Sequence, residues 1–309
     1  MYKKMLVVLD GSKLAEVVFP CAKELAGSLG IDVDLLHVYI SSRQEFVPMY
    51  RSYIDSTAEK IQSMAREIQS KLRQDEKPVE AHGVLVKGYH ADEILKYAES
   101  NHIDLIVMAS HGRSGVSRWS MGSVADKILR ASNVPVWLVR AGIENTVSYD
   151  QWPSRTFLVP LSSSDISSAA LPHAEELVKG KSSVPTNIVL LEVCEPPPVP
   201  TYYSPELTGV PLNWGNFAEE ELTRSKKAAT EHLAKIEEQL RSKGISNVKS
   251  MILSGKAADE IINYANNNPF TVIVMATHGR SGLSRLVYGS VAESVLFGIT
   301  NPLVMVKPQ

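Results

Sequence analysis

Cysteine is scarce in this sequence. Among 309 residues there are only two cysteines, Cys21 and Cys194, which lie in different halves and in no CxxC or Cys/His cluster. A small secreted domain stabilised by disulfides would carry many more, at regular spacing. The scarcity argues against that class and predicts two reduced, buried thiols in a cytosolic protein. The 8 histidines are scattered too, so no metal-ligand set is expected.

The chain also lacks an excess of charge and a long apolar run. Its 32 basic and 34 acidic residues give a net charge of −2, whereas a nucleic-acid-binding surface usually shows a marked basic excess. No apolar run approaches the roughly 20 residues that span a bilayer. The first apolar run meets Asp10 too early for a signal peptide. We therefore expect no nucleic-acid partner, no membrane span and a cytoplasmic location.

The length and an internal repeat both indicate two domains. A chain of 309 residues is too long for one ordinary core and suits two domains of about 150 residues each. The segments Val107–Leu129 and Val274–Leu296 are identical at 15 of 23 positions. A polar stretch without periodicity, residues 141–155, separates the two copies. We predict domains at residues 1–142 and 154–309.

Each half shows the same alternation of short apolar runs and amphipathic segments, which is typical of an α/β protein with a parallel sheet covered on both faces. In the first half we expect strands at residues 3–9, 33–39, 79–86, 104–110 and 134–140, and helices at residues 10–30, 54–72, 91–101 and 122–132. In the second half we expect strands at residues 156–162, 187–194, 248–254, 271–277 and 301–308, and helices at residues 165–180, 217–244, 258–267 and 289–300.

One insertion distinguishes the halves. Residues 195–216, rich in proline and tyrosine, follow the second strand of the second half and replace a shorter segment of the first half. A long irregular connection of this kind is either a lid or binding loop, or disordered.

The repeated glycine- and serine-rich segment lies between a strand and a helix. Ligands of doubly wound sheets bind beyond the carboxyl ends of the strands. We expect the glycines Gly112, Gly115 and Gly122 to adopt positive φ and to let the backbone approach a ligand. Free N–H groups at the start of a helix favour a phosphate. Ser123 can donate its hydroxyl or cap the helix, and two cations of the segment, Arg113 and Arg118, can reach the same anion.

A plainer interpretation stays open at this point: the glycines build a tight turn and Ser123 only caps a helix. Fifteen matching residues are more than a generic turn requires. His111 and His278 suggest catalysis, but no Ser-His-Asp order, metal spacing or pair of carboxylates surrounds them. Packing within the loop, or a place beside the phosphates, fits them better. The motif GxxxxGK[ST] is absent, so this is not a P-loop.

Four separated segments, "VVLDGS", "LLHVY", "KGYHADEI" and "MASHGRSGVSRWSMGSVADKIL", resemble the universal stress protein family. The resemblance covers both halves and so indicates a tandem protein. It implies that each half is a doubly wound domain with a five-stranded parallel sheet of order 3-2-1-4-5. It further implies ATP or a related nucleotide in many members, and pairing of domains through the fifth strand. A homodimer is compatible with it.

Nucleotide-binding members carry a Gly, two residues, a second Gly, nine residues and then Gly-Ser or Gly-Thr. In the first half this pattern falls on Ala109, Gly112 and Gly122-Ser123; in the second it falls on Ala276, Gly279 and Gly289-Ser290. Both copies thus replace the first glycine by alanine, which adds one methyl group.

The family's other ligand-side positions are carried over one by one. The carboxylate at the end of the first strand is Asp10, and its counterpart in the second half is Ser162. The resemblance implies nucleotide binding by Asp10, Val38, Gly88, Met108, Ala109, His111, Gly112, Arg113, Gly115, Gly122, Ser123 and Val124, and in the second half by Val193, Gly255, Met275, Ala276, Gly279, Gly282, Gly289, Ser290 and Val291. Because Ser162 lacks the charge, we expect weaker binding there. Mg²⁺ or Mn²⁺ would be held mainly by the phosphates.

Three functions are compatible with these residues. The first is a cytosolic sensor or regulator that binds adenine nucleotide, the second is a slow ATPase, and the third is a scaffold whose two sites are vestigial. We find no base or Walker-type lysine, so any turnover should be weak.

Overall fold

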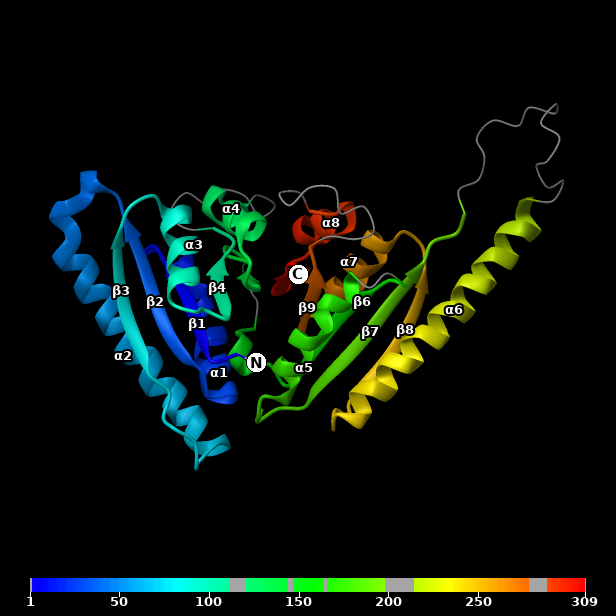
Figure 1. Cartoon of the computed structure of the whole chain (residues 1–309), viewed down its shortest axis with the longest axis horizontal. Helices are drawn as coiled ribbons and strands as arrows, with labels where there is room; N and C mark the ends of the chain where they lie inside the picture. Colours follow the sequence, from blue (N-terminus) through cyan, green and yellow to red (C-terminus); the bar gives the residue numbers. More distant parts are fainter. Residues whose placement is uncertain are drawn as a thin grey trace.

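The computed structural model describes residues 2–111, 121–143, 147–163, 166–197, 214–277 and 288–308. Within these ranges the strands form a single ten-stranded sheet of order β3-β2-β1-β4-β5-β10-β9-β6-β7-β8 (Figure 1). The first half of the chain builds one end of this sheet and the second half builds the other.

The main elements of the first half are, in order, β1 (Lys4–Leu9), α1 (Phe19–Leu29), β2 (Asp32–Tyr39), α2 (Val47–Leu72), β3 (Ala81–Lys87), α3 (His90–Ser100), β4 (Leu105–Ala109), α4 (Ser123–Ala131) and β5 (Val136–Val139). Those of the second half are β6 (Arg155–Leu161), α5 (Leu171–Lys179), β7 (Thr186–Cys194), α6 (Trp214–Ser242), β8 (Val248–Ser254), α7 (Ala257–Asn267), β9 (Thr271–Ala276), α8 (Ser290–Gly298) and β10 (Leu303–Val306).

Each half is a doubly wound α/β unit, which confirms the expected fold class. The five strands of each half run parallel to their neighbours, and each half has the order 3-2-1-4-5 when its strands are numbered along the chain. β5 and β10 pair with each other in antiparallel orientation, with Leu303 opposite Leu138 and Val304 opposite Trp137. The last strand of each half thus lies in the middle of the joint sheet.

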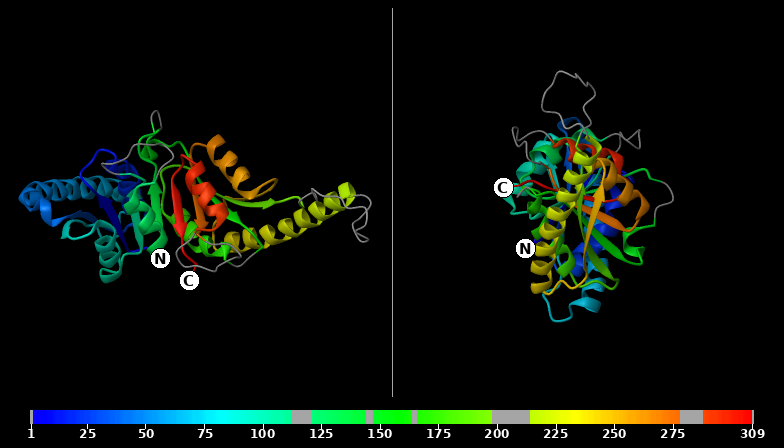
Figure 2. Two further views of the ribbon diagram at one scale, coloured as in Figure 1. Left: turned by 90° about the horizontal axis from the view of Figure 1, so that it is seen from above. Right: turned by 90° about the vertical axis from the view of Figure 1, so that its right-hand side faces the viewer.

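The helices cover the two faces of the sheet in separate layers (Figures 1 and 2). Helices α1, α2, α5 and α6 bury their apolar side chains in one core cluster. Helices α3, α4, α7 and α8 bury theirs in a second cluster on the opposite face. Both clusters contain residues from both halves, so each core runs across the seam between β5 and β10.

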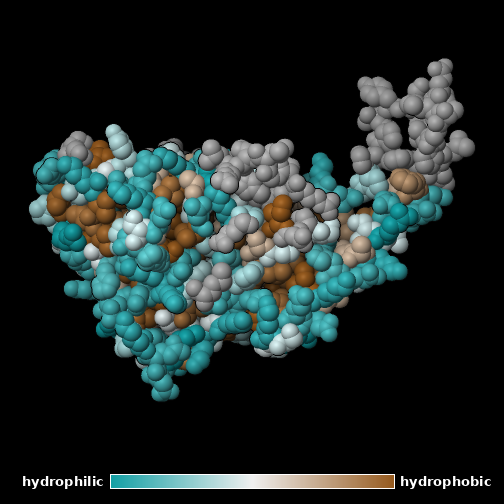
Figure 3. Space-filling view, in the orientation of Figure 1, coloured by the Kyte–Doolittle hydropathy of each residue, from teal (hydrophilic) through white to brown (hydrophobic). Residues whose placement is uncertain are grey.

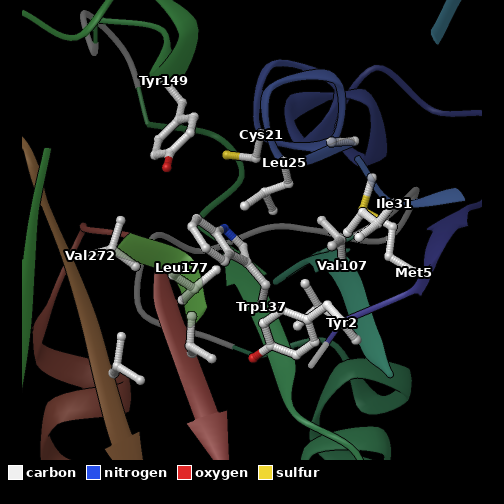
Figure 4. Close-up of a cluster of buried hydrophobic side chains, with 14 of the residues drawn as sticks. Tyr2, Met5, Cys21, Leu25, Ile31, Val107, Trp137, Tyr149, Leu177 and Val272 are labelled. Atoms are coloured by element: carbon white, nitrogen blue, oxygen red, sulfur yellow. The ribbon is translucent and has the colours of Figure 1, made fainter. Parts of the chain in front are cut away.

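Aromatic side chains fill the seam on the α1 and α5 face. Trp137 of β5 is fully buried, and its ring lies among Cys21 and Leu25 of α1 and Leu177 of α5 (Figure 4). Tyr149, from the segment between the halves, packs edge-on against Trp137 with ring centroids 5.7 Å apart. That connection is therefore held in the core at Tyr149 and does not run freely over the surface.

Polar contacts also join the halves. Nη2 of Arg155 lies 2.6 Å from Oε2 of Glu24, with both side chains largely buried. The hydroxyl of Tyr2 lies 2.8 Å from Nδ1 of His173. The ion pair is largely buried and the hydrogen bond is partly buried, and each joins a side chain of the first half to one of the second. They set how the first half sits against the second.

The prediction of one helix over residues 10–30 is wrong in its first part. Gly11 has φ +78°, and the backbone N–H of Ala15 donates to the carbonyl and the hydroxyl of Ser12. This turn leads into a short 3-10 helix, Ala15–Val18, and α1 begins only at Phe19. Pro20 explains the break, because proline has no N–H and is tolerated in the first turn of a helix but not in its interior.

The surface of the face in Figure 3 is mostly hydrophilic, notably along α6. Seen from above in Figure 2, the N-terminal part of α6 extends beyond the sheet. Most of the insertion before it, residues 198–213, lies outside the described residues. The prediction of a lid or of disorder there stays a prediction.

Candidate functional site

A cavity of about 340 Å³ lies in the first half, at the carboxyl ends of β1, β2 and β4. β1 lies between β2 and β4, so the chain leaves these strands toward opposite faces, and the ends diverge into a crevice. Eight of the residues predicted to bind a ligand line the cavity: Asp10, Val38, Met108, Ala109, His111, Gly122, Ser123 and Val124. The structure therefore brings them together from four separate segments.

A tight turn holds the carboxylate of Asp10 at the cavity wall. Oδ1 of Asp10 accepts hydrogen bonds from the backbone N–H of Ser12 at 2.9 Å and from its hydroxyl at 2.6 Å. The positive φ of Gly11 permits this turn, which a residue with a side chain would strain. The carboxylate is thus held in place before a ligand arrives.

The start of α4 forms the opposite wall. The N–H of Gly122 donates to the carbonyl of Ser110 at 2.9 Å, and the N–H of Ser110 donates to the carbonyl of Val139 at 2.8 Å. A Cβ on Gly122 would lie 3.1 Å from that Ser110 oxygen, which is closer than ordinary contact. These bonds place the first turn of α4 directly over the end of β4.

Two details of this segment differ from the prediction. Gly122 has φ −62° and so does not adopt the expected positive φ; Gly289, its counterpart in the second half, has a similar φ of −63°. Close approach to the strand end explains why Gly122 has no side chain. Gly122 itself is the N-cap, and no side chain among the described residues caps α4, so Ser123 begins the helix instead of capping it. Other predicted ligand residues, Gly112, Arg113, Gly115, Gly279 and Gly282, lie outside the described residues, together with Arg118 and His278.

His111 is buried in the wall of the cavity. Its Nδ1 lies 3.2 Å from the hydroxyl of Ser110. Burial, and secondarily the positive charge of Arg140, lower the pKa of His111. Because the lowered pKa favours the neutral imidazole, His111 is a poor source of positive charge for a phosphate.

Several residues of the cavity were not predicted from the sequence. Tyr50, from the first turn of α2, packs its ring 4.6 Å from that of His37 on β2. α2 begins at Val47, earlier than the predicted start at residue 54, and this extension brings Tyr50 over the strand. The apolar stripe at residues 54, 58 and 61, continued back by four, would have indicated Tyr50. The further lining residues are Val8, Leu9, Ala15, Tyr39, Ile40, Arg43, His90, Ile94, Ser110 and Ala125.

Gly88 shapes the cavity without lining it. It has φ +156°, and its N–H donates to the carbonyl of Tyr39 at 2.9 Å. A Cβ there would collide with Glu93 of α3. This turn starts α3 at the position where His90 and Ile94 reach the cavity.

The second half repeats the backbone of this site. The N–H of Gly289 donates to the carbonyl of Thr277, and the N–H of Thr277 donates to the carbonyl of Val306, both at 2.8 Å. Gly255 repeats Gly88, with φ +149° and an N–H that donates to the carbonyl of Cys194. The predicted residues Val193, Met275, Ala276, Ser290 and Val291 occupy the matching strand ends and helix start.

The side chains of the second half differ in charge. Ser162, at the position of Asp10, interacts with Ser167, whose hydroxyl lies 3.0 Å from the backbone of Ser162. Glu192 takes the place of His37 and is buried against Nδ1 of His232 at 2.8 Å. Oε1 of Glu195 accepts from the N–H of Ala257, the first residue of α7, at 2.8 Å. The rim of this half thus carries acidic groups of its own.

The residues that the structure describes show neither a metal site nor a membrane-spanning helix. They contain no group of three or more His, Cys, Asp or Glu side chains arranged to hold a metal ion. None of the helices in this part of the chain is long and apolar enough to cross a membrane.

The comparison with known families matches the universal stress protein family model over residues 1–140 and again over residues 153–307. The chain belongs to the universal stress protein family. It carries two segments of that family in tandem.

Known relatives match about half of this tandem chain. Universal stress protein YxiE of Bacillus subtilis is 32% identical over 148 residues, which are 45% of this chain and 100% of the relative. A universal stress protein of Methanocaldococcus jannaschii is 30% identical over 155 residues, 45% of this chain and 96% of the relative. A crystal structure from Archaeoglobus fulgidus, described as a universal stress protein, covers 98% of both chains with a TM-score of 0.61 and 21% identity. That last likeness shows the fold alone.

Proposed function

We propose that this universal stress protein is a cytosolic sensor or regulator that binds an adenine nucleotide in the cavity of its first half. The observation that carries the proposal is the pairing of a held carboxylate, Asp10, with an uncapped helix start, Gly122-Ser123, across one cavity. A carboxylate suits a ribose hydroxyl, and the N–H groups of a helix start suit a phosphate. Two buried free thiols, Cys21 and Cys194, support a reducing location.

The chemistry of the cavity fits the whole nucleotide. Val38, Met108 and Ile94 supply apolar contacts for a base, beside the rings of His37 and Tyr50. Asp10 would bind the ribose, and the first turn of α4 would bind the phosphates. A Mg²⁺ or Mn²⁺ ion that accompanies the phosphates would be held mainly by phosphate oxygens.

The second half is proposed as the weaker site. It retains the glycine–serine backbone at Gly289-Ser290 but has Ser162 where the first half has Asp10. Glu195 already occupies the N-terminus of α7, and Glu192 replaces His37. Negative groups around the rim oppose an anionic ligand.

We also propose that the domains are residues 1–142 and 154–309, and that the pairing of β5 with β10 holds them together within one chain. The apolar register Leu138–Leu303 and the buried Trp137 support this arrangement. A homodimer would then need a surface other than these two strands.

Mass spectrometry of ligand released from freshly purified protein tests the proposed function against the scaffold alternative. We expect ATP, ADP or AMP in the released fraction. Protein that carries no nucleotide, and acquires none when incubated with ATP, would favour the scaffold. Comparing phosphate release by the wild type and by an Asp10→Ala variant tests for slow ATP hydrolysis.

Replacing Asp10 with Asn should weaken ATP binding roughly 10- to 100-fold, because a charge-assisted hydrogen bond contributes about 1.5–3 kcal/mol. Asn keeps an Oδ1 that can accept from Ser12, so the turn survives while the charge is lost. Titration calorimetry with ATP measures the change. Ser12→Ala is the matched control, since it loosens the turn and retains the carboxylate; an effect of Ser12→Ala as large as that of Asp10→Asn would contradict a direct role of the charge.

A further inference from the structure

Arg140 is a buried cation that has no counter-charge among the residues that the structure describes. It directly follows β5 and is 7% exposed. Its Nη1 and Nη2 atoms have no hydrogen-bond partner among the residues that the structure describes. Burial lowers the pKa of Arg140 to about 10, which still leaves the guanidinium protonated at neutral pH. Buried charges in proteins are normally paired, so this one lacks something that the functional protein should supply.

The other buried arginine shows how this fold satisfies such a group. Arg155, 5% exposed, donates to Glu24 at 2.6 Å and to Ser182 at 3.2 Å, and its guanidinium lies 4.6 Å from the ring centroid of Tyr149. Arg140 has no contact of these kinds among the described residues. Packing alone therefore does not explain an arginine at position 140.

The position of Arg140 places it beside the cavity. Side chains alternate along β5, and Val136 and Leu138 belong to the core that α4 covers, so Arg140 points to the α4 side. Its neighbour Val139 accepts from Ser110, and Ser110 accepts from Gly122 at the start of α4. After burial, the positive charge of Arg140 is the second cause of the lowered pKa of His111, which lines the cavity. Arg140 thus lies next to the start of α4, where the phosphates are proposed to bind.

We propose that Arg140 is the counter-charge for the phosphoryl groups of the nucleotide in the first-half cavity, and so makes this site selective for nucleoside di- and triphosphates. This rests on the proposed function. The start of α4 offers N–H groups and a partial charge, whereas Arg140 adds a full positive charge. Each additional phosphoryl group then increases the binding affinity through its attraction to the arginine, whereas the base and the ribose carry no charge that the arginine attracts.

The second half supplies a matched control. Lys307 follows β10 as Arg140 follows β5, but it is only partly buried, and its Nζ lies 3.3 Å from Oδ1 of Asn133. Lys307→Met removes a positive charge at the corresponding strand end without touching the first-half cavity. It should leave nucleotide selectivity unchanged.

The experiment compares ATP, AMP and adenosine binding to ligand-free wild type, Arg140→Met, Arg140→Lys and Lys307→Met. We expect Arg140→Met to lose about 10-fold or more in ATP affinity while adenosine binding changes little. Arg140→Lys keeps the charge but not the planar guanidinium, so its ATP affinity should lie between those of the wild type and Arg140→Met. Without ligand, Arg140→Met should be at least as heat-stable as wild type, because an apolar side chain replaces an unpaired buried charge. An unchanged ratio of ATP to adenosine affinity would overturn the proposal, as would a ligand-free Arg140→Met that is markedly less stable.

A second arm separates this inference from the proposed function. Pyrophosphate alone is added to wild type and to Arg140→Met, and the unfolding temperature is measured. If wild type binds no nucleotide but pyrophosphate stabilises it and not Arg140→Met, the proposed function fails and the Arg140 site takes a free phosphate. If neither nucleotide nor pyrophosphate distinguishes the two proteins, the anion site itself is refuted.

Discussion

A Leu138→Lys variant is expected to unfold at much lower denaturant concentration and to be cut rapidly between the halves. Leu138 is 1% exposed and lies opposite Leu303 in the β5–β10 pair. A lysine there would bury an ammonium without a partner, which costs about 3–5 kcal/mol of unfolding free energy. Opening the seam would also release Tyr149 and Trp152, which are both 6% exposed in the connecting segment. Chymotrypsin cleaves after aromatic residues such as Tyr149 and Trp152 and does not cleave after lysine, so the substitution itself adds no cleavage site.

Two control variants make this result specific to the seam. Leu138→Met preserves the volume and should cost little. Phe217→Lys adds the same charge at a position that is 41% exposed on α6, far from the seam, and should leave the protease resistance unchanged. Equal resistance and equal unfolding midpoints for Leu138→Lys and wild type would show that the β5–β10 contact does not hold the halves together.

A Gly122→Val variant is expected to lose the tight nucleotide site, with ATP affinity reduced more than about 100-fold, whereas Gly289→Val should retain that site. A Cβ alone at position 122 would lie 3.1 Å from the carbonyl oxygen of Ser110, and a valine side chain adds two methyl groups to that Cβ. The wall of the cavity would have to move away from β4. The second half has no counterpart of the Asp10 charge. The Gly289→Val substitution, which alters that half, should therefore remove at most the weaker nucleotide site.

Titration calorimetry on both variants, with unfolding midpoints measured in parallel, decides the ranking of the two sites. If both variants lose stability to the same extent, that loss reflects the replacement of a glycine at this backbone position and not a change in ligand binding. Retention of tight binding in Gly122→Val together with its loss in Gly289→Val would reverse the ranking. The insertion at residues 195–216 is where such a reversal would originate, because Tyr202, Tyr203 or Trp214 could stack on an adenine.

The parts of the fold that follow from local pattern were predictable. The strand–loop–helix order around Val107–Leu129 follows from apolar runs and from glycines. It placed Ala109 at the end of a strand and Gly122-Ser123 at the start of the next helix. The pairing of β5 with β10, by contrast, was expected only from the resemblance to the universal stress protein family. What these patterns fix is the order of elements and the face that each buries.

Features that depend on contacts between distant segments were not predictable. The apolar stripe of α2 indicates that Tyr50 is buried, but its place at the cavity, against His37, depends on how α2 packs over β2. Arg155 and Arg140 are both buried arginines near strand ends, yet Arg155 has Glu24 as a partner and Arg140 has none among the described residues. The reason for glycine at position 122 is the distance to Ser110, and that distance exists only in the folded chain.

Titration of ATP into ligand-free protein, with and without Mg²⁺, tests the central claim most directly. We expect one tight site per chain, which is weakened by Asp10→Asn and lost in Gly122→Val. Absence of binding in both conditions would contradict it.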